Sequence, residues 1–353
     1  MNYEQELKDL LSTVTLEGGS DLHLSEGRHP TIRVNGILIP MVKKPILTHA
    51  DIDSLLNLMI NDASRKRFAD NKELDFSYQF TPEARFRGNA YIQRSAHTIA
   101  LRLIQNKIKT LKELGLPEVL ENFARMKQGF FLVVGPVGQG KTTTLASMVE
   151  LINQERAEHI ITIEDPIEYL YEQKKSIVDQ REIYVDTDSF ENALTSVLRQ
   201  DVNVILLGEM RNPETISAAV TAAETGHLVL STLHTNNAAQ TIDRIIDSFP
   251  PNQQDQIRTQ LASCLTGIFS QRLIPKISGG MVPAYELMIA NNATSNLIRE
   301  KRSYEINTVI ETGMGEGMID MNRSLAELVR RGEITIESAY KHSLNPKNLE
   351  RMV

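Results

Sequence analysis

The chain has 353 residues but contains only one cysteine, Cys264. A single cysteine excludes an internal disulfide and a zinc site built from four thiolates, and it is typical of proteins from a reducing compartment. Cys264 lies in the apolar stretch 261–265, where a buried structural thiol is expected rather than a nucleophile. The cysteine content therefore favours a cytoplasmic protein.

Long apolar runs and basic runs are also missing. No apolar run approaches the roughly 20 residues that cross a bilayer, and the acidic segment 1–8 has no signal-peptide pattern. Any membrane association is therefore expected to be peripheral or through a partner protein. The net charge is −7, and no basic cluster supports nucleic-acid binding. With 41% hydrophobic and 24% charged residues, the composition is that of a globular protein long enough for two domains.

The first part of the chain mixes helical and extended patterns. Apolar residues at helical spacing predict an amphipathic helix over 1–17, and Thr48 is expected to begin a second helix that continues to about residue 70. Alternating patterns predict strands over 21–24, 31–34, 37–39, 74–80, 85–93 and 98–104. We therefore predict an α+β domain over 1–104, followed by a polar, basic linker over 105–115.

Beyond the linker, short apolar runs alternate with helical segments. The predicted strands are 130–134, 159–163, 203–207 and 228–233. This alternation predicts an α/β domain over 116–353 with a mostly parallel sheet flanked by helices. From about residue 285 the pattern is only helical, so 285–353 is expected to be a helical region.

A glycine-rich turn directly after the first of these strands is the most informative segment. It consists of Gly135, Pro136, Val137, Gly138, Gln139, Gly140, Lys141 and Thr142, and it matches G-x-x-x-x-G-K-[ST]. Backbone N–H groups in such a loop and the start of the next helix bind phosphate oxygens. We expect ATP here, with Lys141 at the β- and γ-phosphates and Thr142 on Mg²⁺, and with Thr143 next to them.

Two further strands end at carboxylates. The run 160–163 leads into Glu164, and the run 204–207 leads into Gly208 and Glu209. Ligands bind beyond the carboxyl ends of parallel strands, so these side chains are candidates for catalysis. Glu209 is the first candidate to polarise the attacking water, and Glu164 could orient Mg²⁺ or water. Together with Thr142, both carboxylates are candidates to hold Mg²⁺, partly through water. A solvated turn after each strand is the alternative.

Histidines and arginines complete the candidate residues. His227 and His234 flank the strand 228–233, near opposite ends and on opposite faces, so a shared metal site is not expected. Each could be structural, contact phosphate or couple neighbouring subunits. One or two of four arginines in the first domain could neutralise a γ-phosphate, the others being ordinary surface residues. These are Arg85, Arg87, Arg94 and Arg102.

Together these segments resemble the secretion ATPases of type IV pili and type II secretion over nearly the whole chain. The similar segments are GSDLHL (19–24), ARFRGN (84–89), ITIEDPIEY (161–169), GEMR (208–211), AAETGHLVLSTLHTN (222–236) and RIIDSFP (244–250). The segments 296–300 and 304–306 resemble a motif of the pilus retraction group. The chain also lacks the four-cysteine motif and the extra N-terminal domain that are usual in extension and secretion members.

The resemblance implies a RecA-like P-loop core with a PAS-like N-terminal domain, assembled as a homohexamer. It implies that ATP hydrolysis drives pilus retraction and twitching motility through a platform protein of the inner membrane, with a pilus-extension ATPase as a counterpart. The implied catalytic residues are Lys141, Glu164, Glu209 and His234 together with the arginines, and His227 is placed with the nucleotide-binding residues.

Four positions depart from the usual family pattern. Val137 and Gln139 replace Thr and Ser in the phosphate loop, and Asn203 and Asn212 replace aspartates near Glu209. The lost acids motivate one alternative, an assembly module that switches shape on binding nucleotide with little hydrolysis. A nucleic-acid translocase with a similar core is a second alternative. A type II secretion or pilus-extension ATPase is a third.

Overall fold

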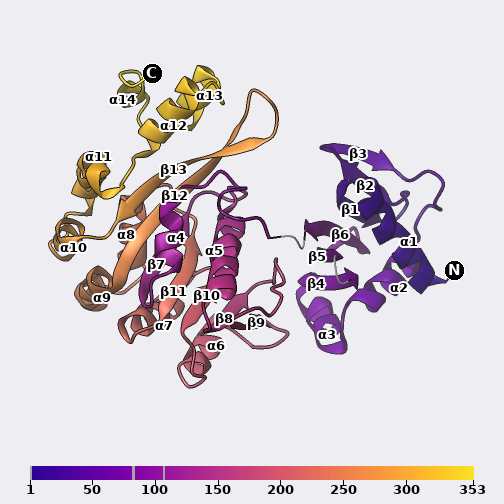
Figure 1. The fold of residues 1–353 in the computed structure, drawn as a ribbon. Helices are drawn as coiled ribbons and strands as arrows, with labels where there is room; N and C mark the ends of the chain where they lie inside the picture. Colours follow the sequence, from indigo (N-terminus) through magenta and orange to yellow (C-terminus); the bar gives the residue numbers. More distant parts are fainter. Residues whose placement is uncertain (1, 82–83, 106–107) are drawn as a thin grey trace. The chain divides into compact units, whose positions relative to one another are not determined.

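The computed structural model describes residues 2–81, 84–105 and 108–353 (Figure 1). Its internal contacts divide the chain into two compact units. Unit 1 comprises Met1–Lys107 with Pro166–Leu170, and unit 2 comprises Ile108–Asp165 with Tyr171–Val353. Residues 106 and 107 of the predicted linker lie outside the described residues. The domain limits 1–104 and 116–353 and the linker 105–115 remain sequence-based predictions.

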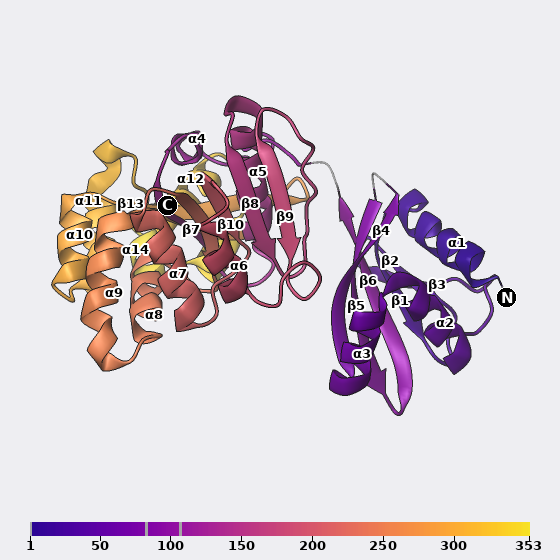
Figure 2. The same ribbon diagram turned by 90° about the horizontal axis from the view of Figure 1, so that it is seen from below.

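Unit 1 is built on an antiparallel sheet. In its described part the sheet has six strands, in the order β3-β2-β1-β6-β5-β4. The strands are β1 Gly19–Ser25, β2 Thr31–Val34, β3 Ile37–Pro40, β4 Glu73–Thr81, β5 Ala84–Gln93 and β6 Ala96–Gln105. The helices are α1 Tyr3–Leu16, α2 His49–Met59 and α3 Asp62–Asn71. Apolar residues of the helices and of β1, β2, β4, β5 and β6 form one core, which confirms the predicted α+β character (Figures 1 and 2).

The single helix predicted from Thr48 to about residue 70 is wrong, because two helices occupy this segment. Thr48 does cap α2, and its side chain accepts a hydrogen bond from the Asp51 N–H. Ile60 is extended, and the Asn61 side chain then accepts from the Ser64 N–H at 2.8 Å and begins α3. Asparagine is a strong N-cap, and its amide competes with continuation of the preceding helix. The apolar spacing runs across this break, so periodicity could not show it.

Unit 2 is built on a mostly parallel sheet, as predicted. In its described part the sheet has seven strands in the order β13-β12-β7-β11-β10-β8-β9, and β13 alone is antiparallel to its neighbour. The strands are β7 Gly129–Val134, β8 His159–Glu164, β9 Ile177–Glu182, β10 Val204–Leu207, β11 Leu228–Leu233, β12 Leu265–Pro275 and β13 Met281–Ile289. The helices before the C-terminal region are α4 Val119–Ala124, α5 Lys141–Glu155, α6 Phe190–Val197, α7 Pro213–Glu224, α8 Ala238–Asp247 and α9 Pro251–Cys264.

Three of these strands were not predicted. The prediction of a purely helical pattern from residue 285 is wrong for 285–289, which belong to β13. The interior of β9 is polar, and β12 and β13 carry Gln271, Arg272 and Glu286. These polar residues interrupt the continuous apolar run by which a buried strand is predicted. These polar side chains have partners inside unit 2, and sequence alone does not show those partners.

Helices cover both faces of the sheet in unit 2. Phe130, Leu132 and Val134 of β7 join the core with α6 to α9, whereas Phe131 and Val133 join the core with α4 and α5 (Figures 1 and 2). A strand buried on both faces reads as a continuous apolar run, which is why β7, β8, β10 and β11 were found from the sequence. Cys264 is buried here, and burial raises the pKa of its thiol to about 12, as expected for a structural cysteine.

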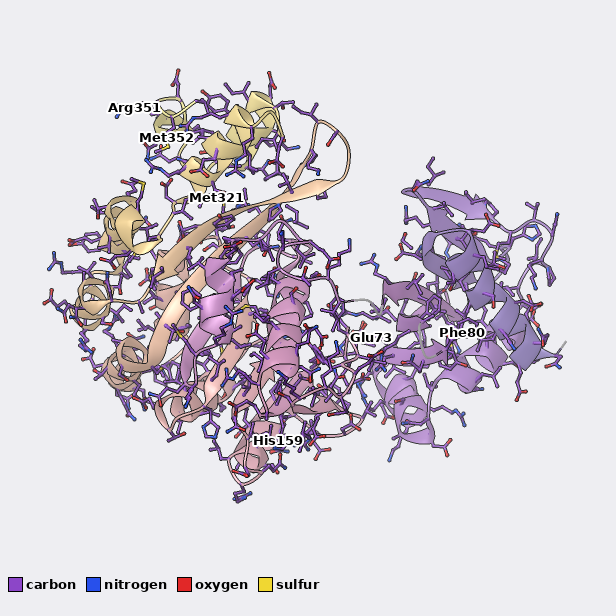
Figure 3. The ribbon with its side chains drawn as sticks, in the orientation of Figure 1. Glu73, Phe80, His159, Met321, Arg351 and Met352 are labelled. Carbon is purple, nitrogen blue, oxygen red and sulfur yellow. The ribbon has the colours of Figure 1, made fainter. Side chains whose placement is uncertain are left out.

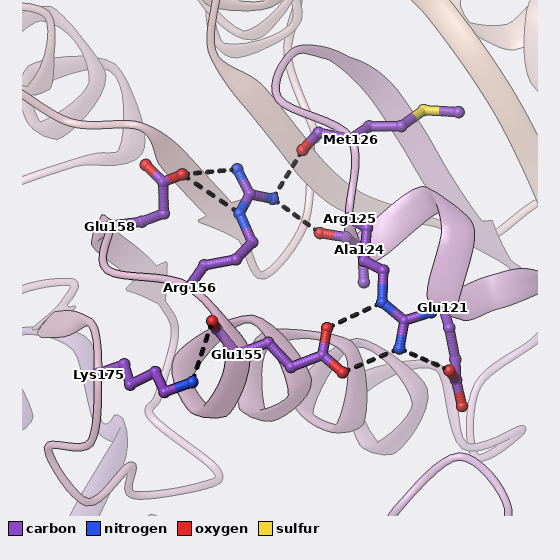
Figure 4. A network of polar contacts seen from close by, with 8 residues as sticks. All are labelled: Glu121, Ala124, Arg125, Met126, Glu155, Arg156, Glu158 and Lys175. Atoms are coloured by element: carbon purple, nitrogen blue, oxygen red, sulfur yellow. Dashed lines mark hydrogen bonds and ion pairs between the residues drawn. The ribbon is translucent and has the colours of Figure 1, made fainter.

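Salt bridges fix the C-terminal end of α5, the helix that follows the glycine-rich loop. Arg125 Nε and Nη2 donate to the Glu155 carboxylate at 2.8 and 2.9 Å, and Nη2 also donates to Glu121. Arg156 Nη1 donates to the carbonyls of Ala124 and Met126 (Figure 4). The end of α5 is therefore held against α4, while its first turn lies at the phosphate loop.

Besides two short 3-10 helices, five α-helices follow β13 in the described segment 290–353. They are α10 Asn292–Arg299, α11 Ile306–Thr312, α12 Met321–Arg330, α13 Ile336–His342 and α14 Pro346–Leu349. The last three pack on β12 and β13 in a separate apolar cluster, in which Met321 is buried and Met352 packs at the edge (Figure 3). In the described ranges 2–81, 84–105 and 108–353, no helix has the length and apolar character needed to span a bilayer.

A candidate nucleotide-binding site

The glycine-rich loop connects β7 to α5 at the carboxyl edge of the parallel strands. Gly135, Gly138 and Gly140 have φ angles of 148°, 77° and 79°, which side chains strongly disfavour. A Cβ atom on Gly135 would lie 2.4 Å from the Gln271 carbonyl oxygen. Gly140 caps α5 in a left-handed conformation. The glycines are therefore needed for the turn itself, which aims the start of α5 and its N–H groups at a bound phosphate.

Lys141 is the first residue of α5 and is 6% exposed. Its Nζ donates to the carbonyls of Gly135 and Pro136, both at 2.9 Å. The ammonium group thus lies inside the curve of the loop, where phosphate oxygens are its natural partners. Thr142 and Thr143 are half-buried in the same first turn, so the Thr142 hydroxyl lies at the start of α5, where a Mg²⁺ ligand is predicted.

Gln139 fixes the loop to β12. Its side-chain oxygen accepts from the Leu273 N–H at 2.7 Å, and its backbone oxygen accepts from Gln271 Nε2 at 2.8 Å. The Gln271 side-chain oxygen in turn accepts from Thr144 Oγ1 at 2.6 Å. Gln139 is one of the departures from the family pattern, and here its long side chain holds the loop to the neighbouring strand. Val137 is 81% exposed and makes the loop surface apolar at that point.

Glu209 follows the end of β10, and its side chain is 18% exposed. One carboxylate oxygen forms a salt bridge with Arg211, and the other lies 3.7 Å from His234 Nε2. The hydrogen bond from Arg211 to Glu209 raises the pKa of the arginine further above its usual range. The carboxylate therefore lies between Arg211 and His234 at the edge where a nucleotide would bind.

His234 links Lys141 to Glu209. Its Nδ1 lies 3.2 Å from Lys141 Nζ, and its Nε2 faces Glu209. Burial, and then the positive charge of Lys141, lower the pKa of His234, so the ring is neutral at pH 7. A neutral ring whose Nδ1 accepts from the lysine carries its proton on Nε2, toward Glu209. The structure thus brings three predicted catalytic residues together.

Glu164 ends β8 and lies at the same edge, because Ile163 pairs with Leu207 in parallel strands. It is 4% exposed, and its carboxylate accepts from Thr162 Oγ1 at 2.6 Å and from Gln180 Nε2 at 3.4 Å. This arrangement anchors the carboxylate to its own sheet. Its predicted role in orienting Mg²⁺ or water remains a prediction.

His227 lies at the other end of β11. The next residue, Leu228, pairs with Gly129 at the start of β7, whereas the phosphate loop follows the end of β7. His227 Nδ1 is 2.9 Å from the Ala222 carbonyl oxygen. The expected separation of the two histidines is therefore confirmed. Within unit 2, His227 does not reach the loop, and its predicted part in nucleotide binding remains a prediction that requires another subunit.

Both asparagines that replace family aspartates have structural partners. Asn203 precedes β10 and exchanges backbone and side-chain hydrogen bonds with His159, which Figure 3 marks at the start of β8. This is the edge of the sheet opposite to Glu209. Asn212 caps α7, and its side chain accepts from the Thr215 N–H at 2.9 Å. Since asparagine and aspartate cap helices about equally well, the loss of the acid at 212 leaves this contact intact.

The four candidate arginines lie in unit 1. Arg85 and Arg87 alternate with buried residues of β5 and therefore share its outer face. Arg102 of β6 pairs directly with Arg87, so it lies on the same face. Arg94 lies instead in the turn between the two strands, with φ of 49°. The structure thus groups three of the four and separates Arg94.

The three grouped arginines already have partners within unit 1. Arg85 Nη2 donates to Ser77 Oγ at 2.5 Å, and Arg87 Nη1 donates to Glu168 at 3.1 Å. Arg102 Nε donates to Asp21 at 2.9 Å, although its side chain is 69% exposed. Hydrogen bonding to Ser20 and Arg102 holds the pKa of Asp21 below its usual range, against the opposing effect of burial.

Comparison with known proteins identifies the family. The profile described as "Type II/IV secretion system protein" matches residues 2–341. The chain belongs to this family. The type IV pilus retraction ATPase PilT of Pseudomonas aeruginosa is 44% identical over 97% of this chain and 99% of its own length. A twitching motility protein of Neisseria gonorrhoeae is also 44% identical, over 91% of this chain and 86% of its own length.

A solved structure agrees with this assignment. The crystal structure of the pilus retraction motor PilT with bound ADP superposes with a TM-score of 0.91 at 45% identity, covering 98% of this chain and 99% of the other. The predicted resemblance to secretion ATPases and the predicted RecA-like α/β fold are therefore confirmed.

Sequence reasoning missed polar residues of β12 and β13 that support the site of this secretion ATPase. Glu286 accepts from the Ala238 N–H at 2.8 Å and from Ser270 Oγ at 3.2 Å. Arg272 Nη2 donates to Asn236 at 2.9 Å. Both therefore hold the segment between His234 and α8. Glu286 and Arg272 follow no recognisable spacing, so only their packing reveals this role.

Glu286 is expected to make stability depend on pH. Burial raises the pKa of this carboxyl from 4.5 to about 7. The folded protein therefore binds a proton that the unfolded chain releases, and the contribution of this group falls as pH rises from about 4.5 to about 7. The loss amounts to about 3 kcal/mol. We expect thermal unfolding of Glu286→Gln and wild type to differ with pH. The stability of the variant minus that of wild type should be more favourable at pH 8 than at pH 5.

The surface variant Glu337→Gln is the matched control for this measurement, because Glu337 lies exposed in the first turn of α13. Its difference from wild type should be the same at both pH values. A stability difference for Glu286→Gln that is equally constant between pH 5 and pH 8 would show that the buried carboxyl does not titrate in this range.

Proposed function

We propose that this chain is an ATP-hydrolysing motor that powers retraction of a type IV pilus. The observation that carries the proposal is the convergence of Lys141, His234 and Glu209 at the phosphate loop, in a chain 44% identical to PilT over nearly its full length. In this role it would act in the cytoplasm, on a platform protein of the inner membrane, and alongside a pilus-extension ATPase.

Hydrolysis would use the residues of unit 2 in distinct roles. The triphosphate would replace the loop carbonyls as the partner of Lys141. Mg²⁺, with Thr142 as the fitting hydroxyl ligand, would neutralise phosphate charge. Glu209 would give up its salt bridge with Arg211 and bind the attacking water instead. It would hold this water in line with the leaving group. His234 lies between Lys141 and Glu209, so it would couple a change in the phosphate contacts of Lys141 to the catalytic carboxylate.

The arginines would supply positive charge to the transferring phosphoryl group. Arg85, Arg87 and Arg102 share one face of the sheet in unit 1, so they are better placed than Arg94 to act as a group. An arginine finger commonly comes from a neighbouring domain or subunit. We therefore propose a homohexamer in which ATP binding closes the domains on the nucleotide and hydrolysis and product release reopen them, and this motion pulls pilin from the fibre.

The alternatives are less well supported. Asn203 and Asn212, which motivated a switch module with little hydrolysis, make structural contacts that need no carboxylate. Type II secretion protein E of Xanthomonas campestris is 36% identical over 73% of this chain and 45% of its own length, whereas PilT matches along both full lengths. The net charge of −7 weighs against a nucleic-acid translocase.

Phosphate release and solution mass together test the proposal. The purified chain should release phosphate steadily with Mg·ATP, without stimulation by DNA, and should assemble to about six times the chain mass of 39.7 kDa. Almost no release above background would favour the switch module, and strong stimulation by DNA would favour the translocase. A chain that stays monomeric and releases no phosphate would contradict the motor.

A further inference from the structure

Two histidines and an aspartate converge in unit 1, outside the nucleotide site. His49 and Asp53 lie one turn apart on α2, and His97 lies near the start of β6. His97 Nδ1 hydrogen-bonds to one oxygen of Asp53, and His49 Nε2 lies 3.4 Å from the other. One potential ligand atom from each of the three residues lies within 4.8 Å of the others.

The arrangement of the rings suits a shared metal ion. The two imidazole centroids are 5.1 Å apart. Two imidazoles bound tetrahedrally to one ion with Zn–N bonds of about 2.0 Å would have centroids roughly 5 Å apart. Two imidazoles and one carboxylate are also a donor set that favours Zn²⁺ and similar ions over Mg²⁺.

Neighbouring residues orient the two rings. Glu26 Oε2 lies 3.9 Å from His49 Nδ1, the nitrogen that does not face Asp53. A carboxylate behind a histidine fixes the tautomer that presents the other nitrogen to a metal. The ring of Phe68 packs edge-on against His97 at 4.9 Å. Glu26 therefore lies on the side of His49 that faces away from Asp53, and Phe68 packs against the ring of His97.

A cavity beside the cluster provides access. It has a volume of about 240 Å³, and Asp53 and His97 contribute to its wall together with Leu56, Phe68 and Ile92. Arg65, the cation in this wall, forms an ion pair with Asp62. A cavity of this volume can hold water next to Asp53 and His97.

We propose that His49, Asp53 and His97 bind a divalent transition metal ion, with Zn²⁺ as the best-fitting ion. The ion ties α2 to β6, whose apolar residues share the core of unit 1. It is a structural ion of unit 1 and does not depend on the proposed motor activity.

Zinc titration of the full-length, chelator-treated protein tests the proposal by calorimetry. Wild type should bind one Zn²⁺ per chain at this site, and Zn²⁺ should raise the temperature at which unit 1 unfolds. His49→Gln and His97→Gln should each weaken binding by about 100-fold, and Glu26→Gln by about 10-fold. His49 is 46% exposed, so its replacement should leave the fold intact. His29→Gln is the matched control, because His29 lies in unit 1 outside the cluster, with its Nδ1 2.7 Å from the Lys44 carbonyl oxygen.

Saturating Mg·ADP should leave the zinc affinity unchanged, since the cluster belongs to unit 1 and the phosphate loop to unit 2. The proposal is wrong if no saturable zinc site is found. It is equally wrong if His49→Gln and His97→Gln bind like wild type, or if Mg·ADP abolishes binding, because the ion would then occupy the nucleotide site.

Discussion

Replacement of Glu209 by glutamine is expected to lower steady-state ATP hydrolysis by at least about 1000-fold while nucleotide binding is retained. Glutamine keeps the size of the side chain and can still approach His234, but it lacks the charge that orients and polarises water. It also loses the salt bridge to Arg211, so the arginine becomes free to interact with phosphate. Phosphate release and equilibrium binding of a fluorescent ATP analogue measure the two effects separately.

Glu214→Gln is the matched control for this variant. Glu214 is also a carboxylate just beyond β10, but it is exposed in the first turn of α7. Its loss should leave turnover within about twofold of wild type, as is usual for surface substitutions. If Glu209→Gln retained turnover close to that of wild type, Glu164 would become the first candidate for the catalytic carboxylate.

Replacement of Lys141 by glutamine is expected to weaken ATP binding by on the order of 100-fold or more, because each charge-assisted hydrogen bond to phosphate contributes about 1.5–3 kcal/mol. The buried position of Lys141 makes the loss larger than at a surface site. Glutamine can still donate to one of the loop carbonyls, so the loop should keep its shape. Calorimetric titration with ADP and ATP measures the affinities, and circular dichroism checks the fold.

Lys127→Gln provides the control, since Lys127 is exposed shortly before β7 and its replacement removes the same charge from the chain. ATP should lose more affinity than ADP in Lys141→Gln if the ammonium group reaches the γ-phosphate. Equal losses for both nucleotides would place it at the β-phosphate alone, and unchanged affinities would contradict a role in phosphate binding.

These two variants separate binding from chemistry. Lys141→Gln should fail at low ATP concentration and recover partly at high concentration, whereas Glu209→Gln should stay inactive at every concentration. His234 contacts both residues, so removal of its ring should affect the two properties together. The contact geometry, rather than the motif, leads to this distinction.

The phosphate loop and the carboxylates at strand ends could be predicted because their chemistry is local in sequence. A strand, a loop with three glycines at positive φ and a helix start follow one another along the chain, and Glu209 lies two residues beyond the end of β10. Parallel pairing then brings the ends of β7, β8, β10 and β11 to one edge without further information. In the same way, continuous apolar runs identified these four strands, because both faces of the sheet are covered.

Contacts between distant segments could not be predicted in this way. Gln271 donates a hydrogen bond to Gln139, which is 132 positions away in the sequence. Glu286 accepts one from Ala238, which is 48 positions away. The break at Ile60 depends on whether Asn61 caps a new helix or continues the old one, and that choice is made by packing. His97 is similarly separated from Asp53 by 44 positions.

The order of residues along the chain therefore determined the nucleotide chemistry, because backbone conformation and neighbouring side chains suffice to build a phosphate loop. Only the tertiary structure decided which polar side chains support that loop, which arginines share a face and where the histidines of unit 1 meet. Those features depend on pairings between strands and helices whose free energy comes from burial and hydrogen bonding across the fold, and no local pattern encodes them.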